Sequence, residues 1–467
     1  MSASIGLIGL GVMGGNLALN IAERGYSVAV YNRTVERTAA FLESADELAG
    51  QFVPTQSLEE LVAAVAAPRM IIVMVPAGAA VDAQLEALLP HLEPGDLVLD
   101  CGNADFNETQ RRLASLADTG IGWVGVGVSG GSEGARFGPS IMVGCSEAEY
   151  ERVGPVLSAI AAQYEGDACC ARLGTDGAGH FVKTLHNGIE YADMQMLAEA
   201  YGIMRDGLGW SAAEIGAVFE RWNEGVLNAY LVEITAEVLK VEDAESGGPL
   251  VDVIADRAGQ KGTGTWSAIE AQKLGRPATT VEAAVSARCV SALAGMRQSL
   301  AELYSDAGGN PMEFTEDTIE LLELALLAGR LCAYAQGFST IAAASREHHW
   351  DVPLTRVAEI WRAGCIIRSR LLDDMAAAFR GGVQYDNLLT YDQFVPQVTV
   401  AVPALRHIVG TCVAAGLPIP ALSAALAWFD GIRQARGTAN LIQGQRDFFG
   451  SHGFERLDKA GDFHGPW

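Results

Sequence analysis

Hydrophobic residues in the first part of the chain occur in short runs that alternate with stretches of helical pattern. The runs are four to six residues long, rich in Val and Ile, and bounded by Gly, Pro, Asn or Asp; they predict strands at 5–8, 28–31, 70–75, 97–100 and 123–126. Helical patterns lie between them, as at 16–23 and 81–89. Alternating strands and helices favour a parallel sheet covered on both faces, so residues 1–176 are expected to form an α/β domain.

The pattern changes after Gly177, where strand signals end. Apolar residues then recur at positions i, i+3, i+4 and i+7 over 180–206, 211–240, 279–304, 315–348 and 353–379. This spacing is typical of amphipathic helices, so 177–435 is predicted to be a large all-helical domain. The last segment, 436–467, is polar and Gly-rich without a period that would let it pack alone. We expect a short extended tail that lies across another surface, such as a second subunit.

Composition restricts the class of protein further. The 467 residues are 49% hydrophobic and 19% charged, which is typical of a globular chain, and the formal net charge is −25. Such a charge repels nucleic acid and anionic lipid, so neither is an expected partner. We predict no transmembrane helix and no signal peptide. The eight cysteines form no Cys-x-x-Cys pair, which indicates buried thiols in a reducing cytoplasm and no metal site.

The first candidate site directly follows the first predicted strand, where the chain reads Gly9, Leu10, Gly11, Val12, Met13 and Gly14. This is the G-x-G-x-x-G pattern of dinucleotide-binding Rossmann domains, between the strand and the helix that the motif requires. The first Gly allows a tight turn, the second lets pyrophosphate approach the backbone, and the third allows the helix to pack closely on the strand. The helix N-terminus attracts the anion.

The end of the second strand indicates which dinucleotide binds. NAD sites carry Asp or Glu there, but this chain has Asn32, Arg33 and Thr34, with Arg37 one helical turn later. A guanidinium suits the 2′-phosphate of NADP because its fork can bind two oxygens, so NADP is the predicted cofactor. The alternative interpretation is that Thr34 caps a helix beside solvated arginines, and the two roles can coexist.

A second candidate site lies in the predicted helix that follows Gly177. Lys183, His186, Asn187 and Glu190 are spaced to lie on one face over two turns, with the first and last about 10.5 Å apart along the axis. The other faces are apolar, and a polar stripe on a buried helix costs stability unless it serves a site. The alternative is a solvated stripe. Gly188 inside this helix indicates close approach of a ligand or another backbone.

These residue types match a redox reaction at an alcohol. A desolvated Lys loses affinity for its proton and can act as a base near neutral pH. Hydride transfer from a secondary alcohol to NADP needs such a base for the hydroxyl proton. A carboxylic acid on the same helix face can later return a proton to carbon.

Longer segments carry a resemblance to a known family: GLGVMGGNLALN, YNRT, DCGNADFNETQRR, GVSGGSEGARFGPSIMVG, GAGHFVKTLHNGIEYADMQMLAEAY, LVDVIADRAGQKGTGTW, IWRAGCIIRSRLL and RDFFGSHGFE. The chain resembles decarboxylating 6-phosphogluconate dehydrogenases of the long, NADP-dependent type over essentially its whole length. The resemblance implies oxidative decarboxylation of 6-phospho-D-gluconate to D-ribulose 5-phosphate and CO2 in the pentose phosphate pathway. It also implies a homodimer in which 436–467 completes the partner's active site.

Site residues follow from the same resemblance. Lys183 resembles the general base and Glu190 the general acid. The positions that resemble the coenzyme site, beyond the Gly-rich turn and the Asn32–Thr34 segment, are Val75, Pro76, Ala77 and Asn103. The positions that resemble the substrate site are Asn103, Ser129, Gly130, Gly131, His186, Asn187, Tyr191, Lys261, Arg288, Arg446 and His452.

The chain departs from the family pattern at a few positions. Pro76 stands where Lys is usual, so one coenzyme cation is expected to be missing. Further departures are Cys101 for Gly, Ser132 for Glu, and Gly453 for Thr. None of them involves the proposed acid or base.

Two other functions fit part of the sequence. A shorter β-hydroxyacid dehydrogenase would share the first 300 residues or so, but not the Arg288 region or the tail with Arg446 and His452. A non-catalytic NADP-binding protein would share the fold, but it would not need Lys183 and Glu190 intact. The enzyme is therefore the favoured interpretation.

Overall fold

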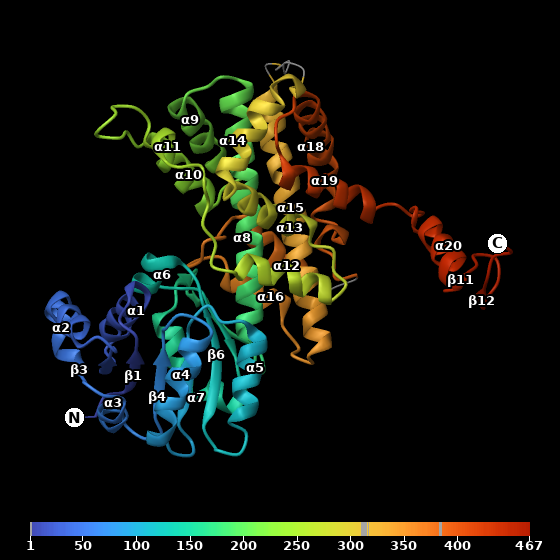
Figure 1. The fold of residues 1–467 in the computed structure, drawn as a ribbon. Coiled ribbons are helices and arrows are strands. Elements are labelled where there is room, and N and C mark those ends of the chain that lie inside the picture. The colour runs from blue at the N-terminus through green and yellow to red at the C-terminus, as the bar shows by residue number, and fades with distance from the viewer. Residues whose placement is uncertain (1, 310–314, 316, 383–384) are drawn as a thin grey trace.

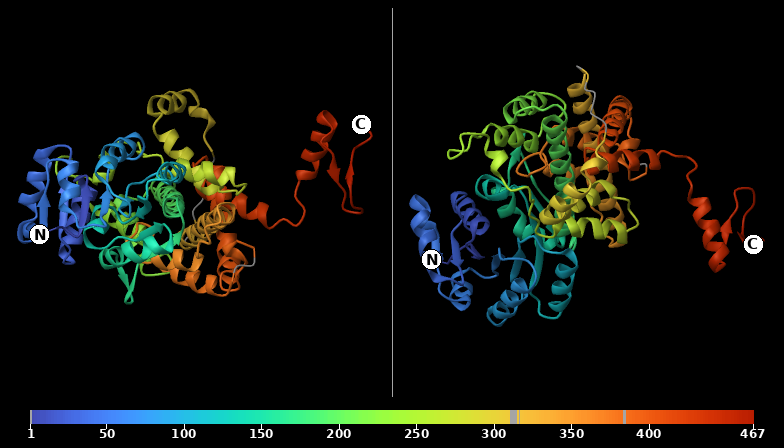
Figure 2. Two further views of the ribbon diagram at one scale, coloured as in Figure 1. Left: turned by 90° about the horizontal axis from the view of Figure 1, so that it is seen from below. Right: turned by 45° about the horizontal axis from the view of Figure 1, so that its top comes forward.

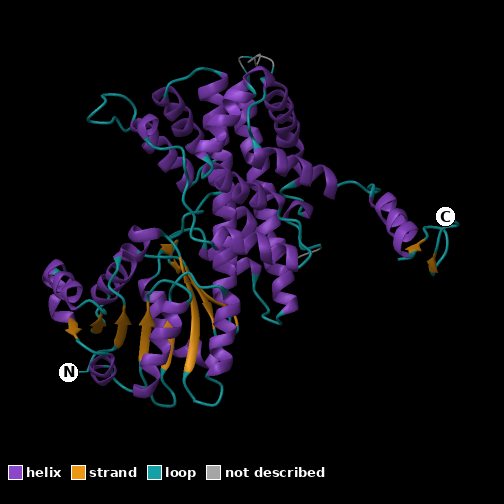
Figure 3. Ribbon diagram, in the orientation of Figure 1, coloured by secondary structure: helices purple, strands orange, loops and turns teal. Residues whose placement is uncertain are grey.

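The computed structural model describes residues 2–309, 315, 317–382 and 385–467. The N-terminal part holds an eight-stranded sheet in the order β10-β7-β6-β5-β4-β1-β2-β3. The strands are β1 Ile5–Ile8, β2 Val28–Tyr31, β3 Phe52–Pro54, β4 Met70–Val73, β5 Leu97–Asp100, β6 Gly122–Val128, β7 Ile141–Gly144 and β10 Cys170–Gly174. A separate small pair is formed by β8 Gln163–Tyr164 and β9 Asp167–Ala168. Figure 3 shows the sheet flanked by helices below a helical domain.

The predicted strands all occur, and the Rossmann-type fold class is confirmed. The predicted strand 70–75 ends at Val73, and 123–126 extends to Gly122–Val128. The expectation of a purely parallel sheet is wrong, because β7 pairs antiparallel with β6 and β10 follows β7 in parallel. β3, β7 and β10 were not predicted. β3 has only three residues, and Gly144 and Gly174 interrupt the apolar signal at the ends of β7 and β10.

Helices cover the sheet and connect its strands. They are α1 Val12–Glu23, α2 Val35–Ser44, α3 Leu58–Ala64, α4 Ala79–Leu88, α5 Phe106–Ser115, α6 Gly131–Phe137 and α7 Glu147–Ile160. The apolar side chains of the sheet form two buried clusters, one on each face. The carboxyl ends of β1, β4, β5 and β6 therefore meet at one edge, which is where ligands bind in open α/β sheets.

The second domain is helical, as predicted. Its helices are α8 Ala178–Gly202, α9 Ala212–Asn223, α10 Tyr230–Lys240, α11 Leu250–Val253, α12 Thr263–Lys273, α13 Thr279–Ser291, α14 Ala294–Leu303, α15 Thr318–Glu347, α16 Leu354–Ile360, α17 Leu371–Arg380, α18 Val395–Ala415 and α19 Pro420–Ile432. The long α8 and α15 run through the middle of the domain (Figure 1). The stretches 211–240, 279–304 and 353–379 each divide into two helices, and a π-helical turn at Ile203–Gly207 follows α8.

By length and composition, α18 alone among the described helices could cross a membrane. It packs against α15 and α19 and buries Ala401, Leu405 and Ile408. Arg406 on its exposed side forms an ion pair with Asp430 of α19, with N and O 2.6 Å apart. In the described structure, α18 thus packs on the helical domain through one face.

The tail differs from the predicted extended segment. It forms α20 Ala439–Gly450 and a hairpin of β11 Phe454–Glu455 with β12 Asp462–Phe463. The buried carboxylate of Asp447 organises this unit by accepting hydrogen bonds from the backbone N–H of Gly453 and Gly465 and from the Trp467 indole. The tail projects away from the rest of the chain in every view (Figures 1 and 2).

The cysteines mostly follow the prediction. All eight are free thiols, and seven are buried. Cys289, on α13, is exposed and is the exception.

Candidate active site

The Gly-rich turn has the geometry that a pyrophosphate site requires. Gly9 has a φ of 100°, and a Cβ there would lie 2.3 Å from the Met74 carbonyl oxygen. A Cβ on Gly14 would lie 1.9 Å from the Gly9 carbonyl oxygen, so only Gly lets α1 pack on β1. A Cβ on Gly11 would meet nothing within 4 Å. The N-terminus of α1 has no acidic residue in its first turn. Open space beside free backbone N–H groups fits a dinucleotide.

A cavity of about 570 Å³ extends from this turn past the end of β2. Arg33, Thr34 and Arg37 line it on one side, and Val75 and Pro76 line it on the other. Asn32 is buried and organises the turn, because its Oδ1 accepts from the Leu10 N–H at 3.1 Å and its Nδ2 donates to the Thr34 carbonyl at 3.0 Å. Thr34 is the N-cap residue of α2, but its side chain makes no capping hydrogen bond. Its hydroxyl therefore remains available for a phosphate.

The loops after β4 and β5 lie next to each other at the same edge. A Cβ on Gly102 would lie 3.1 Å from the Val75 carbonyl oxygen. This closeness places the exposed Asn103 beside the segment of Val75, Pro76 and Ala77. Val12 and Met13, in the first turn of α1, complete the set of coenzyme positions expected from the sequence.

The helix α8, which carries the predicted polar face, approaches the sheet unusually closely because of glycines. A Cβ on Gly127 of β6 would lie 2.5 Å from the Lys183 Cβ, and a Cβ on Gly179 would lie 2.6 Å from the Gly125 carbonyl oxygen. Glycines inside a strand often mark such close approach. Gly125 and Gly127, inside the β6 strand, are therefore a sequence signal for the position of α8.

Lys183 is buried and held by neutral oxygen and nitrogen groups. Its Nζ donates to Asn187 Oδ1 at 2.7 Å and to Ser129 Oγ at 3.2 Å, and lies 3.4 Å from His186 Nδ1. Burial lowers the pKa of Lys183 below its ordinary value, and the Glu190 carboxylate only partly opposes this shift. The amine is therefore poised to act as a base.

Glu190 lies two turns beyond Lys183 on the same face of α8. Burial raises the pKa of Glu190, while Lys183 and Arg288 act in the opposite direction. Its Oε2 lies 3.7 Å from His186 Nδ1. Burial and the neighbouring Lys183 hold the pKa of His186 well below its ordinary value, so this imidazole stays neutral. The predicted polar face thus exists; Lys183, His186 and Asn187 are buried, and Glu190 at its end is partly exposed.

The turn of Ser129, Gly130 and Gly131 closes the site at the end of β6. Gly130 and Gly131 have φ values of 101° and 64°. Ser129 Oγ lies 3.1 Å from His186 Nε2. A Cβ on Gly130 would lie 2.5 Å from the Gly364 carbonyl oxygen, so the loop after α16 supports this turn from behind.

Of the predicted cations, Arg288 on α13 contacts a residue of α8, and Lys261 lies in the loop before α12. The Arg288 guanidinium stacks on the Tyr191 ring, 3.4 Å from its centroid. Tyr191 in turn packs on Gly264, where a Cβ would lie 2.4 Å from the ring. Lys261 is exposed in the loop that leads into α12.

Two predicted substrate residues lie elsewhere in the same chain. Arg446 and His452 belong to the projecting tail, and Arg446 donates to Gln443 at 3.0 Å.

The structure gives a different reason for the glycine at position 188 from the ligand or backbone contact that the sequence predicts. A Cβ there would lie 2.7 Å from the Ser267 side chain, whose hydroxyl donates to the Thr184 carbonyl at 2.6 Å. Gly188 therefore allows α12 to pack on α8.

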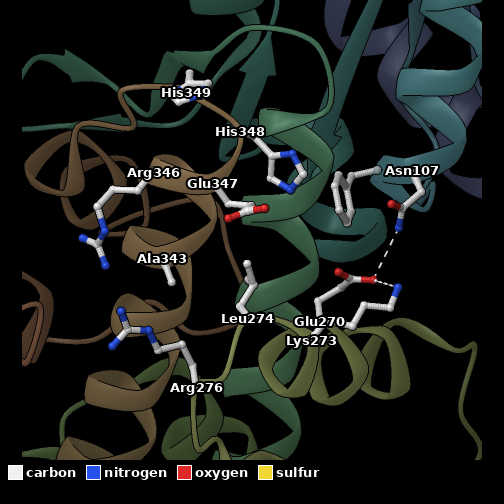
Figure 4. Close-up of a pocket in the computed structure, with 11 residues that line it drawn as sticks. Asn107, Glu270, Lys273, Leu274, Arg276, Ala343, Arg346, Glu347, His348 and His349 are labelled. Atoms are coloured by element: carbon white, nitrogen blue, oxygen red, sulfur yellow. Dashed lines mark hydrogen bonds and ion pairs between the residues drawn. The ribbon is translucent and has the colours of Figure 1, made fainter. Parts of the chain in front are cut away.

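A larger cavity of about 770 Å³ lies outside this site, between α5, α12 and the end of α15 (Figure 4). Its charges are mixed, and Lys273 pairs with Glu270 at 2.7 Å. None of the predicted site residues lines it; the lining is Phe106, Asn107, Glu270, Lys273, Leu274, Arg276, Ala343, Arg346, Glu347, His348 and His349.

The fold and the site together define a dinucleotide-dependent dehydrogenase with a buried lysine on its helical domain. Family models agree with this class and specify it. The NAD binding domain of 6-phosphogluconate dehydrogenase matches residues 4–174, and the C-terminal domain of 6-phosphogluconate dehydrogenase matches residues 179–467. The chain belongs to the 6-phosphogluconate dehydrogenase family.

Individual relatives match over the full length. The chain is 47% identical to the NADP(+)-dependent, decarboxylating 6-phosphogluconate dehydrogenase of Bacillus subtilis (strain 168), over 99% of this chain and 98% of that protein. It is also 44% identical to the NAD(+)-dependent enzyme of the same organism, over 100% of each chain. The solved structure of Plasmodium falciparum 6-phosphogluconate dehydrogenase, described in apo form and with NADP+ or 6-phosphogluconate, has a TM-score of 0.95 at 38% identity, covering 99% of this chain and 100% of that one.

Proposed function

We propose that this chain oxidatively decarboxylates 6-phospho-D-gluconate to D-ribulose 5-phosphate and CO2, with reduction of NADP to NADPH. The observation that carries the proposal is the placement of the buried Lys183 and the partly buried Glu190 on one face of α8, at the edge of the sheet where the coenzyme turn lies. A base and an acid with opposite pKa shifts are what an alcohol oxidation followed by proton return to carbon requires. Arg33 at the end of β2, in place of a carboxylate, favours NADP.

Lys183 acts first. Its neutral amine removes the proton of the carbon-3 hydroxyl. The Gly-rich turn and Arg33 would hold NADP, which would supply the hydride acceptor for that carbon. The β-keto acid that results loses CO2, because the ketone can take up the electron pair. Protonated Lys183 then donates a hydrogen bond to the developing enolate oxygen. Ser129 and Asn187 orient the amine through its two shortest hydrogen bonds to oxygen.

Glu190 completes the reaction by protonating carbon 1 of the enediol. A carboxyl group whose pKa is raised by burial retains its proton closer to neutral pH than an exposed one. His186 stays neutral and binds the substrate through hydrogen bonds. Asn103 and the turn of Ser129, Gly130 and Gly131 lie where they would contact the polar carboxylate end of the substrate.

The substrate phosphate is held by cations from two chains. Lys261 and Arg288 approach from the same chain, while Arg446 and His452 come from the tail of a partner subunit. The exposed apolar side chains of the tail support this assignment, because Leu441, Ile442, Phe448 and Phe449 are all more than half exposed in the single chain. The proposed homodimer therefore has two composite sites. We place the enzyme in the cytoplasm, in keeping with its free thiols.

The proposal is tested by following NADPH and CO2 together with 6-phosphogluconate and NADP, and then with NAD. The expected result is one CO2 per NADPH, with NADP preferred. Unphosphorylated gluconate serves as the control, and its equal use would favour a β-hydroxyacid dehydrogenase. A protein that binds NADP but forms neither product at saturating substrate would be a non-catalytic NADP-binding protein.

A further inference from the structure

A buried polar network lies behind the candidate site and includes none of its predicted residues. His180 is fully buried on α8, one turn before Lys183. Its Nδ1 lies 2.7 Å from Thr109 Oγ1 of α5, and its Nε2 lies 3.1 Å from the carbonyl oxygen of Asp100 at the end of β5. Because a carbonyl only accepts, Nε2 carries the proton and Nδ1 accepts from the Thr109 hydroxyl. One ring thus joins α8, α5 and β5.

The ring has little freedom to move. A Cβ on Gly125 of β6 would lie 3.0 Å from the His180 Nδ1, so the strand packs closely against the imidazole only because this residue has no side chain. Burial lowers the pKa of His180, although Asp100 opposes this shift; Arg112 acts in the same direction as burial. The ring therefore remains neutral and keeps both hydrogen bonds at neutral pH.

The network continues from Asp100 to the coenzyme loop. The Asp100 carboxylate accepts from the Gly102 N–H at 3.1 Å, which fixes the loop that carries Asn103. Its other oxygen lies 3.9 Å from Nη1 of the fully buried Arg112. Arg112 donates to Asp82 Oδ1 at 2.7 Å and to the Gly78 carbonyl at 3.2 Å. Gly78 directly follows the segment of Val75, Pro76 and Ala77.

We propose that His180 and Arg112 are positioning residues for the reaction, fixing the nicotinamide side of the coenzyme site relative to Lys183. This inference rests on the proposed function. His180 holds the helix that carries the base, and Arg112 holds the loop that faces the coenzyme. Hydride transfer depends steeply on alignment, and a displacement of about 1 Å can cost about 100-fold in rate. Neither residue lines the coenzyme cavity, so each acts through the groups that it holds.

The two residues have different kinetic signatures. His180→Leu removes both hydrogen bonds from α8 and is expected to lower kcat by about 100-fold with little change in the Kd for NADP. His180→Gln keeps a polar group there and is expected to recover about tenfold of that loss. Arg112→Lys loses the guanidinium fork and is expected to raise the Kd for NADP by about tenfold, with a smaller effect on kcat.

The pH profile provides a readout that stability alone does not change. Loosening α8 from α5 and β5 admits water to Lys183, so its pKa rises and the acid limb of kcat/KM moves to higher pH in His180→Leu. The charged or titratable groups around Lys183 are His186 and Glu190 on α8, Arg288 on α13 and Cys365 from the loop after α16. All of them are retained in this variant.

The experiment measures kcat, KM, the Kd for NADP, the melting temperature and the pH profile for each variant. Met196→Ala, buried further along α8, is the matched control, expected to lower the melting temperature with wild-type kinetics and pH profile. If His180→Leu does not fold, Thr109→Val removes one hydroxyl and is expected to lower kcat about threefold to tenfold.

Wild-type kcat and an unmoved acid limb in the folded His180 or Thr109 variant would overturn the inference. Equal kinetic losses in Met196→Ala would do so as well. Failure of the proposed function is distinguishable, because the wild-type enzyme itself would then form no NADPH and CO2.

Discussion

The coenzyme half and the substrate half of the candidate site differ in how much of each a single chain supplies. The coenzyme half lies within the sheet domain, where the turn from Gly9 to Gly14, Asn32 and Arg33 surround one cavity. The substrate half contains Lys183, Glu190 and Arg288 in position, but Arg446 and His452 lie on the projecting tail. In the proposed enzyme, coenzyme binding is a property of the subunit and catalysis is a property of the dimer.

The difference has a physical basis. A dinucleotide phosphate is bound mainly by backbone N–H groups at a helix N-terminus, which a short local segment can supply. A terminal phosphate on a small, mobile substrate in a chain of net charge −25 needs several cations brought together. In the proposed dimer, some of those cations are delivered on a separate helix.

The largest expected effect follows removal of the base. Lys183→Met should lower kcat by about 1,000-fold or more, because general base catalysis contributes about 100- to 10,000-fold, while NADP binding stays unchanged. Steady-state turnover and NADP titration measure the two effects. Lys273→Met, which removes an exposed lysine paired with the buried Glu270 on α12, is the control and should retain activity. Turnover near that of the wild type in the Lys183 variant would refute the base assignment.

Loss of the tail cation should affect the substrate half alone. Arg446→Ala is expected to raise the KM for 6-phosphogluconate by about 30-fold, the equivalent of about 2 kcal/mol for a charge-assisted hydrogen bond. The Kd for NADP should not change, and initial rates with NADP titration would separate the two. Arg456→Ala is the matched control, because Arg456 pairs only locally with Asp458, at 2.7 Å, among the described residues. A parallel loss of NADP affinity would contradict the division of the site.

Coenzyme choice should depend on the end of β2. Arg33→Leu is expected to raise the KM for NADP by about tenfold and to leave the KM for NAD nearly unchanged, because only NADP carries the 2′-phosphate. Arg24→Leu, after the end of α1, is the control with the same change of charge. NADP- and NAD-dependent relatives are both more than 40% identical to the chain, so we expect local residues such as Arg33 to determine the choice of coenzyme. Equal effects on the KM for both coenzymes would show that Arg33 does not bind the 2′-phosphate of NADP.

The pH profile should be a bell set by the substrate half. Activity falls with decreasing pH as Lys183 is protonated, and the lowered pKa of Lys183 brings that fall below the range of an ordinary lysine. Activity falls with increasing pH as Glu190 loses its proton, and the raised pKa of Glu190 brings that fall above the range of an ordinary glutamate. Glu190→Gln should remove the alkaline limb. If the alkaline limb were unchanged in that variant, the ionisation of another group would be its cause.

The smallest effect concerns Pro76 at the nicotinamide side. Pro76→Lys restores the cation expected from the family, and an exposed charge contributes about 0.2–1 kcal/mol, so the Kd for NADP should fall by about fivefold at most. Fluorescence titration at low salt measures the change, with Pro76→Ala as the uncharged control. A weaker affinity for NADP in the Lys variant than in the Ala variant would exclude this role.

The sequence was sufficient to predict those features that depend on a local pattern of residues. The turn after β1, the predicted strands that matched and the polar face of α8 all follow from the spacing of neighbouring residues. It was insufficient where a feature depends on distant segments. Gly188 was assigned to a ligand or backbone contact because its neighbour Ser267 is 79 positions away, and β7 reversed direction without any local signal. The partners of His180, on α5 and β5, are equally remote in sequence.

Complementation between two defective subunits tests the account most directly. Lys183→Met and Arg446→Ala chains with different tags are produced together, and the mixed dimer is purified through both tags. One of its two sites then combines an intact Lys183 with an intact partner Arg446, so about half of the wild-type activity per dimer is expected. Activity no greater than the average of the two parent variants would contradict the claim that each substrate site is built from two chains.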